Sequence, residues 1–77
     1  MGVVELNGYT IEPGANLDGA NLFKANLEGV DLTNASLVGA VLEKANLKGA
    51  DLQGAKADEN TTWRKGFDPV AAGVIFD

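Results

Sequence analysis

A five-residue unit repeats nine times in succession between residues 15 and 59 of the chain. The centre of each unit is leucine, except in the last, where it is Ala57. Two residues before each centre stands alanine, or valine at Val30, and the residue between them is mostly Asn or Asp. This period fits neither regular element, because successive leucines would lie about 140° apart on a helix and on alternating faces of a strand. The central leucines are Leu17, Leu22, Leu27, Leu32, Leu37, Leu42, Leu47 and Leu52.

The period instead predicts a short extended segment and a tight turn in every unit. Alanine and leucine then point inward together, while the Asn or Asp between them points outward. Glycine closes most units and supplies the positive φ that a type II turn requires. Four turns of about 90° close a square coil, and we expect coils to stack about 4.8 Å apart through backbone pairing. We expect type I turns, without positive φ, where Lys24, Asn34, Lys44 and Glu59 replace the glycine.

This pattern resembles the pentapeptide repeat family, whose motif is A(D/N)LXX, over nine units at residues 15–59. The resemblance implies an all-β fold, a right-handed quadrilateral β-helix. The segment with Trp63 and then Gly66-Phe67-Asp68-Pro69 is similar to the tail of cyanobacterial and related members of the family. Those members often have proline directly after the tryptophan. Arg64 stands there in this chain, so we expect a looser turn.

An open stack exposes unpaired backbone at both ends, and each end therefore needs a cover. We predict one domain, residues 1–77, made of an N-terminal hairpin cap at 1–14, the repeats at 15–59 and a C-terminal cap at 60–77. Asn7-Gly8 is the preferred pair for a type I′ turn, and apolar and β-branched residues flank it. We expect this hairpin to shield the first coil.

The C-terminal cap is predicted from the continuing five-residue spacing. This spacing places Thr62, Phe67 and Ala72 at central positions, with Phe67 as a plug and Trp63 packed beside it. Asp68-Pro69 is typical of the N-cap and first residue of a helix. One short helical turn, ending at glycine, fits the remaining residues. The apolar residues 74–76 then either pack back on the stack or contact another chain.

Composition narrows the range of functions. The chain has no His and no Cys, so imidazole bases, thiolate nucleophiles and the commonest zinc sites are excluded. A net charge of −5, from six Lys and Arg against eleven Asp and Glu, disfavours direct binding to nucleic acid. The first residues lack the basic start and apolar core of an export signal, and no apolar run is long enough for a membrane span. We expect a cytoplasmic protein without cofactors.

Two groups of side chains are candidate sites. Asp31 and Asp51, twenty residues apart, are expected to stack on one face, as paired carboxylates of a cation site or a glycosidase would. Outward Asp residues that only bond nearby turns are the simpler interpretation, and we predict no metal site. Phe23, Val38 and Val41 break the outward-polar pattern. Clustered exposed apolar residues mark contact sites, so these three form a predicted partner patch, unless a terminal segment covers them.

The prediction for function is a non-enzymatic structural or protein-interaction module with an unidentified partner, and its stack ends could form a homodimer. The resemblance implies an alternative, because some pentapeptide repeat proteins mimic DNA and bind type II topoisomerases. The repeats make between two and three coils, or up to four with the caps, which rise only about 15–20 Å at the strand spacing. One turn of DNA is about 34 Å, so this alternative requires an end-to-end dimer. A metal-dependent activity at Asp31 and Asp51 is the enzymatic alternative.

Overall fold

The computed structural model describes residues 4–77, which form only β-structure and turns, with no helix among them. There are two pairs of short strands, one at residues 4–11 and one that joins residues 56–57 to 75–76, and isolated parallel β-bridges connect other segments of the chain. No helix in the described part is long and apolar enough to cross a membrane. The strands are β1 (Val4–Leu6), β2 (Tyr9–Ile11), β3 (Lys56–Ala57) and β4 (Ile75–Phe76).

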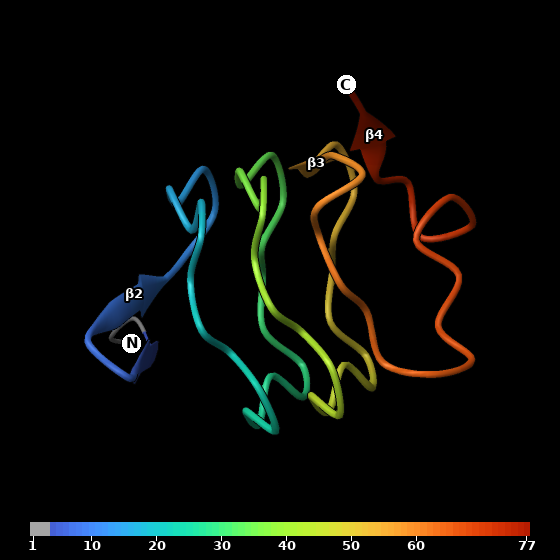
Figure 1. Cartoon of the computed structure of the whole chain (residues 1–77). Helices are drawn as coiled ribbons and strands as arrows, with labels where there is room; N and C mark the ends of the chain where they lie inside the picture. Colours follow the sequence, from blue (N-terminus) through green and yellow to red (C-terminus); the bar gives the residue numbers. More distant parts are fainter. Residues whose placement is uncertain (1–3) are drawn as a thin grey trace.

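Parallel bridges show that the chain returns to the same position every twenty residues. Asn16 pairs with Ser36, and Ser36 pairs in turn with Lys56. The backbone N–H of Leu17 donates to the Ser36 carbonyl over 2.8 Å, and the Ser36 N–H donates back to Ala15 over 2.8 Å. Figure 1 shows the resulting coils lying side by side. The remaining twenty-residue bridges are Asn21 with Val41, Asn26 with Asn46 and Asp31 with Asp51.

The corners of the coil have one conformation whether or not glycine is present. Lys24, Asn34 and Lys44 have φ values of 60°, 62° and 60°, close to the 69° of Gly19. The type I turns expected at these three residues are therefore wrong, and the corners are type II. Glu59 is not among the described residues with positive φ.

The reason for the type II corners is the hydrogen bond between coils. The two turn types differ in the orientation of the central peptide. In the observed orientation the Lys24 N–H donates to the Glu43 carbonyl of the next coil over 3.0 Å, as the Gly19 N–H does to Val38 over 2.8 Å. Stacking thus imposes a left-handed backbone on residues with no intrinsic preference for it.

Replacing Lys44 by glycine is expected to stabilise the protein relative to its replacement by alanine, by about 1 kcal/mol. Both variants lose the lysine side chain, but only glycine adopts a φ near 60° without a steric penalty. Urea denaturation of the two variants measures the difference. Equal stabilities would show that the corner at residue 44 is not left-handed in solution.

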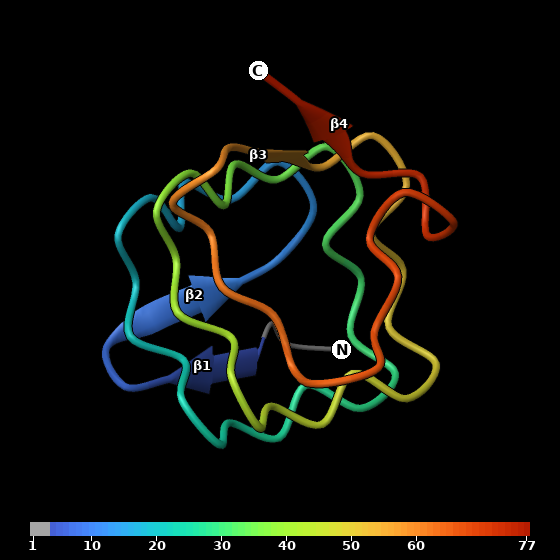
Figure 2. The same ribbon diagram turned by 45° about the vertical axis from the view of Figure 1, so that its right-hand side comes forward.

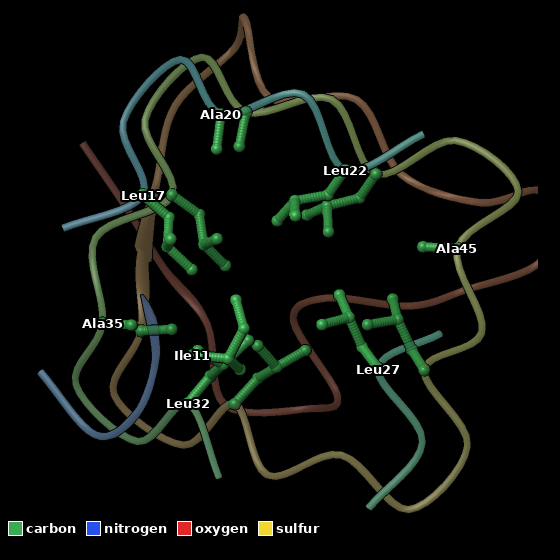
Figure 3. Close-up of a cluster of buried hydrophobic side chains, with 14 of the residues drawn as sticks. Ile11, Leu17, Ala20, Leu22, Leu27, Leu32, Ala35 and Ala45 are labelled. Atoms are coloured by element: carbon green, nitrogen blue, oxygen red, sulfur yellow. The ribbon is translucent and has the colours of Figure 1, made fainter. Parts of the chain in front are cut away.

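The interior of the coil is filled by the central leucines and the small residues two positions earlier. Figure 3 shows Leu17, Leu22, Leu27 and Leu32 pointing toward one another, with Ile11 among them. All of these central leucines are at most 5% exposed, and Ile11 is 4% exposed. Most of the small residues are also buried, with Ala20, Ala35 and Ala40 fully so, while Ala50 is partly buried. The five-residue spacing therefore produces one continuous apolar core.

The hairpin of β1 and β2 lies across the N-terminal end of the coil (Figures 1 and 2). Asn7 and Gly8 have φ values of 52° and 83°, as a type I′ turn requires. Leu6 and Tyr9 pack against the core, and the Asn7 amide donates to the Asn21 carbonyl over 3.1 Å. Residues 1–3 of the predicted 1–14 segment lie outside the described residues.

The third coil contains one extra residue, which changes the predicted register. Val41 pairs with Thr62, twenty-one residues later, so Thr62 points outward and is exposed. Its predicted central position is wrong, because Thr61 occupies the small-residue slot, 7% exposed, and Trp63 follows at the centre. Phe67 is half-buried, and its ring stacks on Trp63 with centroids 5.3 Å apart.

After this region the chain makes one tight turn and returns to the stack. The Asp68 carboxylate accepts a hydrogen bond from the Ala71 N–H over 3.1 Å. The Val74 N–H then donates to Pro69 over 3.0 Å, with Gly73 at a φ of 89°, which is the arrangement of a Schellman motif. β4 pairs in parallel with β3 (Figure 2). The chain thus regains the pattern of the coils, with Val74 buried at 7% exposure.

Candidate functional site

The outward Asn and Asp side chains bond to their own turns. In each case Oδ1 accepts a hydrogen bond from the backbone N–H two residues later, at 3.0 to 3.2 Å. Such bonds stabilise the turn and satisfy a backbone donor that points to the surface. The most regular surface feature of the chain therefore supports its fold. The acceptors are Asn16, Asn21, Asn26, Asp31, Asn46, Asp51 and Asp58.

Asp31 and Asp51 lie on adjacent coils, as predicted from their spacing, and form a bridge pair. Asp31 accepts hydrogen bonds from both the N–H and the hydroxyl of Thr33, and the hydroxyl bond is the main cause that lowers the pKa of its carboxyl. Asp51 accepts from the Gln53 N–H over 3.1 Å. Within residues 4–77, no group of three or more His, Cys, Asp or Glu side chains could hold a metal ion. The geometry assigns turn stabilisation to both carboxylates.

Ser36 is an exception in the outward slot, and the preceding coil compensates for it. The Ser36 hydroxyl donates to the Asp18 carboxylate. The same carboxylate oxygen accepts the Val38 N–H over 3.1 Å, which is the donor that an Asn at position 36 would bind. A bond within one turn is thus replaced by a bond between two coils.

Replacing Asp18 by alanine is expected to lower the free energy of unfolding by about 1 kcal/mol, because the Val38 N–H loses its acceptor. In a Ser36→Asn background the same replacement should cost less than about 0.5 kcal/mol, since the new side chain accepts that N–H locally. Chemical denaturation of the four proteins in this cycle measures the coupling. An identical loss of stability in both backgrounds would show that Asp18 does not take the place of an Asn side chain at position 36.

The predicted partner patch is less apolar than its sequence indicates. Phe23 is 44% exposed, but Val38 and Val41 are half-buried. The ammonium groups of Lys24 and Lys44 lie 5.4 and 6.0 Å from the centroid of the Phe23 ring, within reach of cation–π attraction. The stacking of Lys24 on Lys44 was expected from their twenty-residue spacing, but their position beside the Phe23 ring was not predicted.

The C-terminal end of the stack carries the larger group of exposed apolar side chains. Ile75 and Phe76 on β4 are 55% and 44% exposed, and Val70 is 71% exposed. The stacked rings of Trp63 and Phe67 lie in the same part of the chain. Trp63 also has a buried indole N–H without a hydrogen-bond partner in the described residues.

A cavity of about 340 Å³ opens where the third coil departs from the second. We call it the basic notch. Sequence analysis did not identify it, although the adjacent basic residues Arg64 and Lys65 were a signal. The Arg64 guanidinium donates to the Ala45 carbonyl over 3.1 Å. The equivalent carbonyl one coil earlier, that of Ala25, accepts a backbone N–H from the next coil instead. The notch is lined by Leu47, Lys48, Arg64, Lys65, Gly66 and Phe67.

Comparisons with known proteins agree with the repeat and the fold. A family model described as pentapeptide repeats matches residues 13–37 and 25–59, in eight copies. No curated protein matches the chain. Among solved structures, the chain is similar to alr5209, a pentapeptide repeat protein from Nostoc Pcc 7120, with 34% identity, a TM-score of 0.54 and coverage of 84% of this chain and 70% of that one. Because the family model matches more than half of its residues, the chain belongs to the pentapeptide repeat family.

Proposed function

We propose that the chain is a non-enzymatic structural and protein-interaction module that contacts its partners through the C-terminal end of its stack. The observation that carries this proposal is the exposure of Ile75 and Phe76 on β4. An edge strand with exposed apolar side chains readily pairs with another chain. The outward Asn and Asp side chains are engaged in their own turns, and pentapeptide repeat proteins are generally non-enzymatic structural modules.

In this proposal the coil is a right-handed quadrilateral β-helix with a cover at each end. The β1–β2 hairpin is its N-terminal cap, supported by the contacts of Leu6 and Tyr9 with the core. Residues 60–77 are its C-terminal cap, supported by the contacts of Trp63, Phe67 and Val74 with the same core. The C-terminal cap leaves the outer edge of β4 available for a partner.

The partner that this edge suits best is a second copy of the chain. Two β4 edges related by a two-fold axis would pair in antiparallel fashion and bury Ile75 and Phe76 together. Such a contact joins two stacks end to end.

Sedimentation velocity over a range of concentrations tests this function. We expect the wild-type chain to form a reversible dimer and the Ile75→Lys, Phe76→Lys double variant to remain monomeric. The melting temperature of the variant should equal that of the wild type at concentrations too low for the wild type to dimerise. Val4→Lys is the matched control, because Val4 is also 44% exposed but lies in the hairpin at the other end. A wild-type monomer at every concentration, or a dimer in the double variant, would contradict the proposed contact.

A further inference from the structure

The basic notch exists because the segment of the second coil around Asn46 is not followed by a strand of the third coil. Asn46 pairs with Asn26 of the first coil, but no later residue in the described part of the chain forms a bridge with it. Residues 64–67 instead make a turn, in which the Phe67 N–H donates to Arg64 over 3.1 Å. Figure 1 shows the orange segment diverging from the coils before it. The position that a third strand would occupy is a cavity.

The lining of the notch combines positive charge with an apolar floor. Lys48, Arg64 and Lys65 are half of the six basic residues of the chain. Leu47 and Phe67 supply the apolar surface, and among residues 4–77 no acidic side chain lines the cavity. In a chain with a net charge of −5, this local excess of positive charge favours an anionic group that also carries an apolar side chain.

Backbone N–H groups without hydrogen-bond partners in the described residues lie along the edge of the second coil beside the notch. In the first coil, the N–H groups of Leu27 and Gly29 donate to the second coil over 2.8 and 2.9 Å. The equivalent N–H groups one coil later belong to Leu47 and Gly49, and neither has a hydrogen-bond partner within residues 4–77. They face the C-terminal end, where the notch opens. An extended peptide placed there can accept both through its carbonyl groups.

We propose that the basic notch binds an extended acidic segment of a partner protein. The segment completes the missing strand, accepts the Leu47 and Gly49 N–H groups, and places one apolar side chain against Leu47 and Phe67. Its carboxylates pair with Lys48, Arg64 and Lys65 around the cavity. This inference rests on the proposed function as an interaction module and assigns it a second contact surface, separate from the outer edge of β4.

A short acidic peptide suits the notch better than nucleic acid does. Both ligands are anionic, but a nucleic acid extends its charge over many phosphates and would be repelled by the net negative charge of the chain as a whole. A short peptide confines its carboxylates to the three basic side chains. The strand edge and the apolar floor also favour a peptide, because a phosphate backbone uses neither.

Trp63 provides a direct readout, since it is the one tryptophan of the chain and stacks on Phe67 of the notch. The probe is the blocked peptide acetyl-Glu-Val-Phe-Asp-Glu-amide, with acetyl-Lys-Val-Phe-Lys-Lys-amide as its charge-reversed control. We expect a saturable change in tryptophan fluorescence with the acidic peptide only, weakened by added salt. The amide resonances of Leu47 and Gly49 should shift in the same titration.

Two charge-reversal variants decide whether the notch is the site. Lys65→Glu should weaken binding of the acidic peptide by about tenfold or more. Lys24→Glu, a matched change outside the notch, should leave the affinity unaltered. Equal effects of the two variants, binding of the basic peptide, or no saturable change would overturn the proposal, as would a dimer of the wild-type chain that is lost in Lys65→Glu. The titration is repeated on the Ile75→Lys, Phe76→Lys variant, so failure of the β4 contact and failure of the notch are distinguished.

Discussion

Replacing Leu37 by alanine is expected to lower the free energy of unfolding by about 4 kcal/mol. Leu37 is fully buried in the second coil, and coils stack on both sides of it. Removal of its side chain eliminates apolar burial and leaves a cavity that neighbouring coils cannot fill, because their backbones are hydrogen-bonded at fixed spacing. Urea denaturation followed by circular dichroism measures the change.

Leu47→Ala is the matched comparison for this prediction. Leu47 is in the same coil but lines the basic notch, where no third strand packs on it. Its loss should cost only about 2 kcal/mol, because less packing is removed and water can enter the enlarged notch. If Leu47→Ala destabilised the protein as much as Leu37→Ala, the notch would be closed in solution.

Replacing Thr61 by valine is expected to cost about 3 kcal/mol, although the two side chains have nearly the same shape. The Thr61 hydroxyl donates to the Leu37 carbonyl over 2.8 Å and accepts the N–H groups of Asp58 and Gly39 over 3.1 and 3.2 Å. Thr61 is 7% exposed, so water cannot replace these bonds. Thermal and urea denaturation measure the loss.

The Thr61→Ser variant separates the contribution of the hydroxyl group to stability from that of the methyl group. Serine keeps the three hydrogen bonds and should lower stability by only about 1 kcal/mol, the value of one buried methyl group. The difference in the free energy of unfolding between the valine and serine variants measures how much the hydroxyl stabilises the turn that contains the extra residue of the third coil. A serine variant less stable than the valine variant would refute this role.

Sequence periodicity was sufficient to predict the parts of the fold that depend on inward and outward alternation. The central leucines and the stacking of Asp31 on Asp51 follow from the period alone. The corner conformation of Lys44 could not be predicted in this way. The intrinsic preference of lysine disfavours positive φ. The hydrogen bond that overrides it, from the Lys24 N–H of the neighbouring coil to the Glu43 carbonyl, appears only after stacking.

The register of the third coil was missed for a related reason. By spacing alone Thr62 is the next central residue, and nothing in the period signals the extra residue that moves this position to Trp63. Which residue becomes central depends on the Thr61 hydroxyl. It bonds both to Asp58 and to Leu37 of the preceding coil, and so stabilises the turn that contains the extra residue. The basic notch arises where the third coil departs from the stack, so it too was beyond the reach of periodicity.

The central feature of the structure is a stack of twenty-residue coils that is incomplete at its C-terminal end. Amide hydrogen exchange, resolved by NMR at the central leucines, tests it most directly. The N–H groups of six of them donate to a following coil and are expected to exchange slowly, at similar rates. The N–H groups of Leu47 and Leu52 have no partner within residues 4–77 and should exchange much faster. Equal protection at all eight positions would show that the N–H groups of Leu47 and Leu52 are paired in solution and that the stack is not incomplete there. The six expected to be protected are Leu17, Leu22, Leu27, Leu32, Leu37 and Leu42.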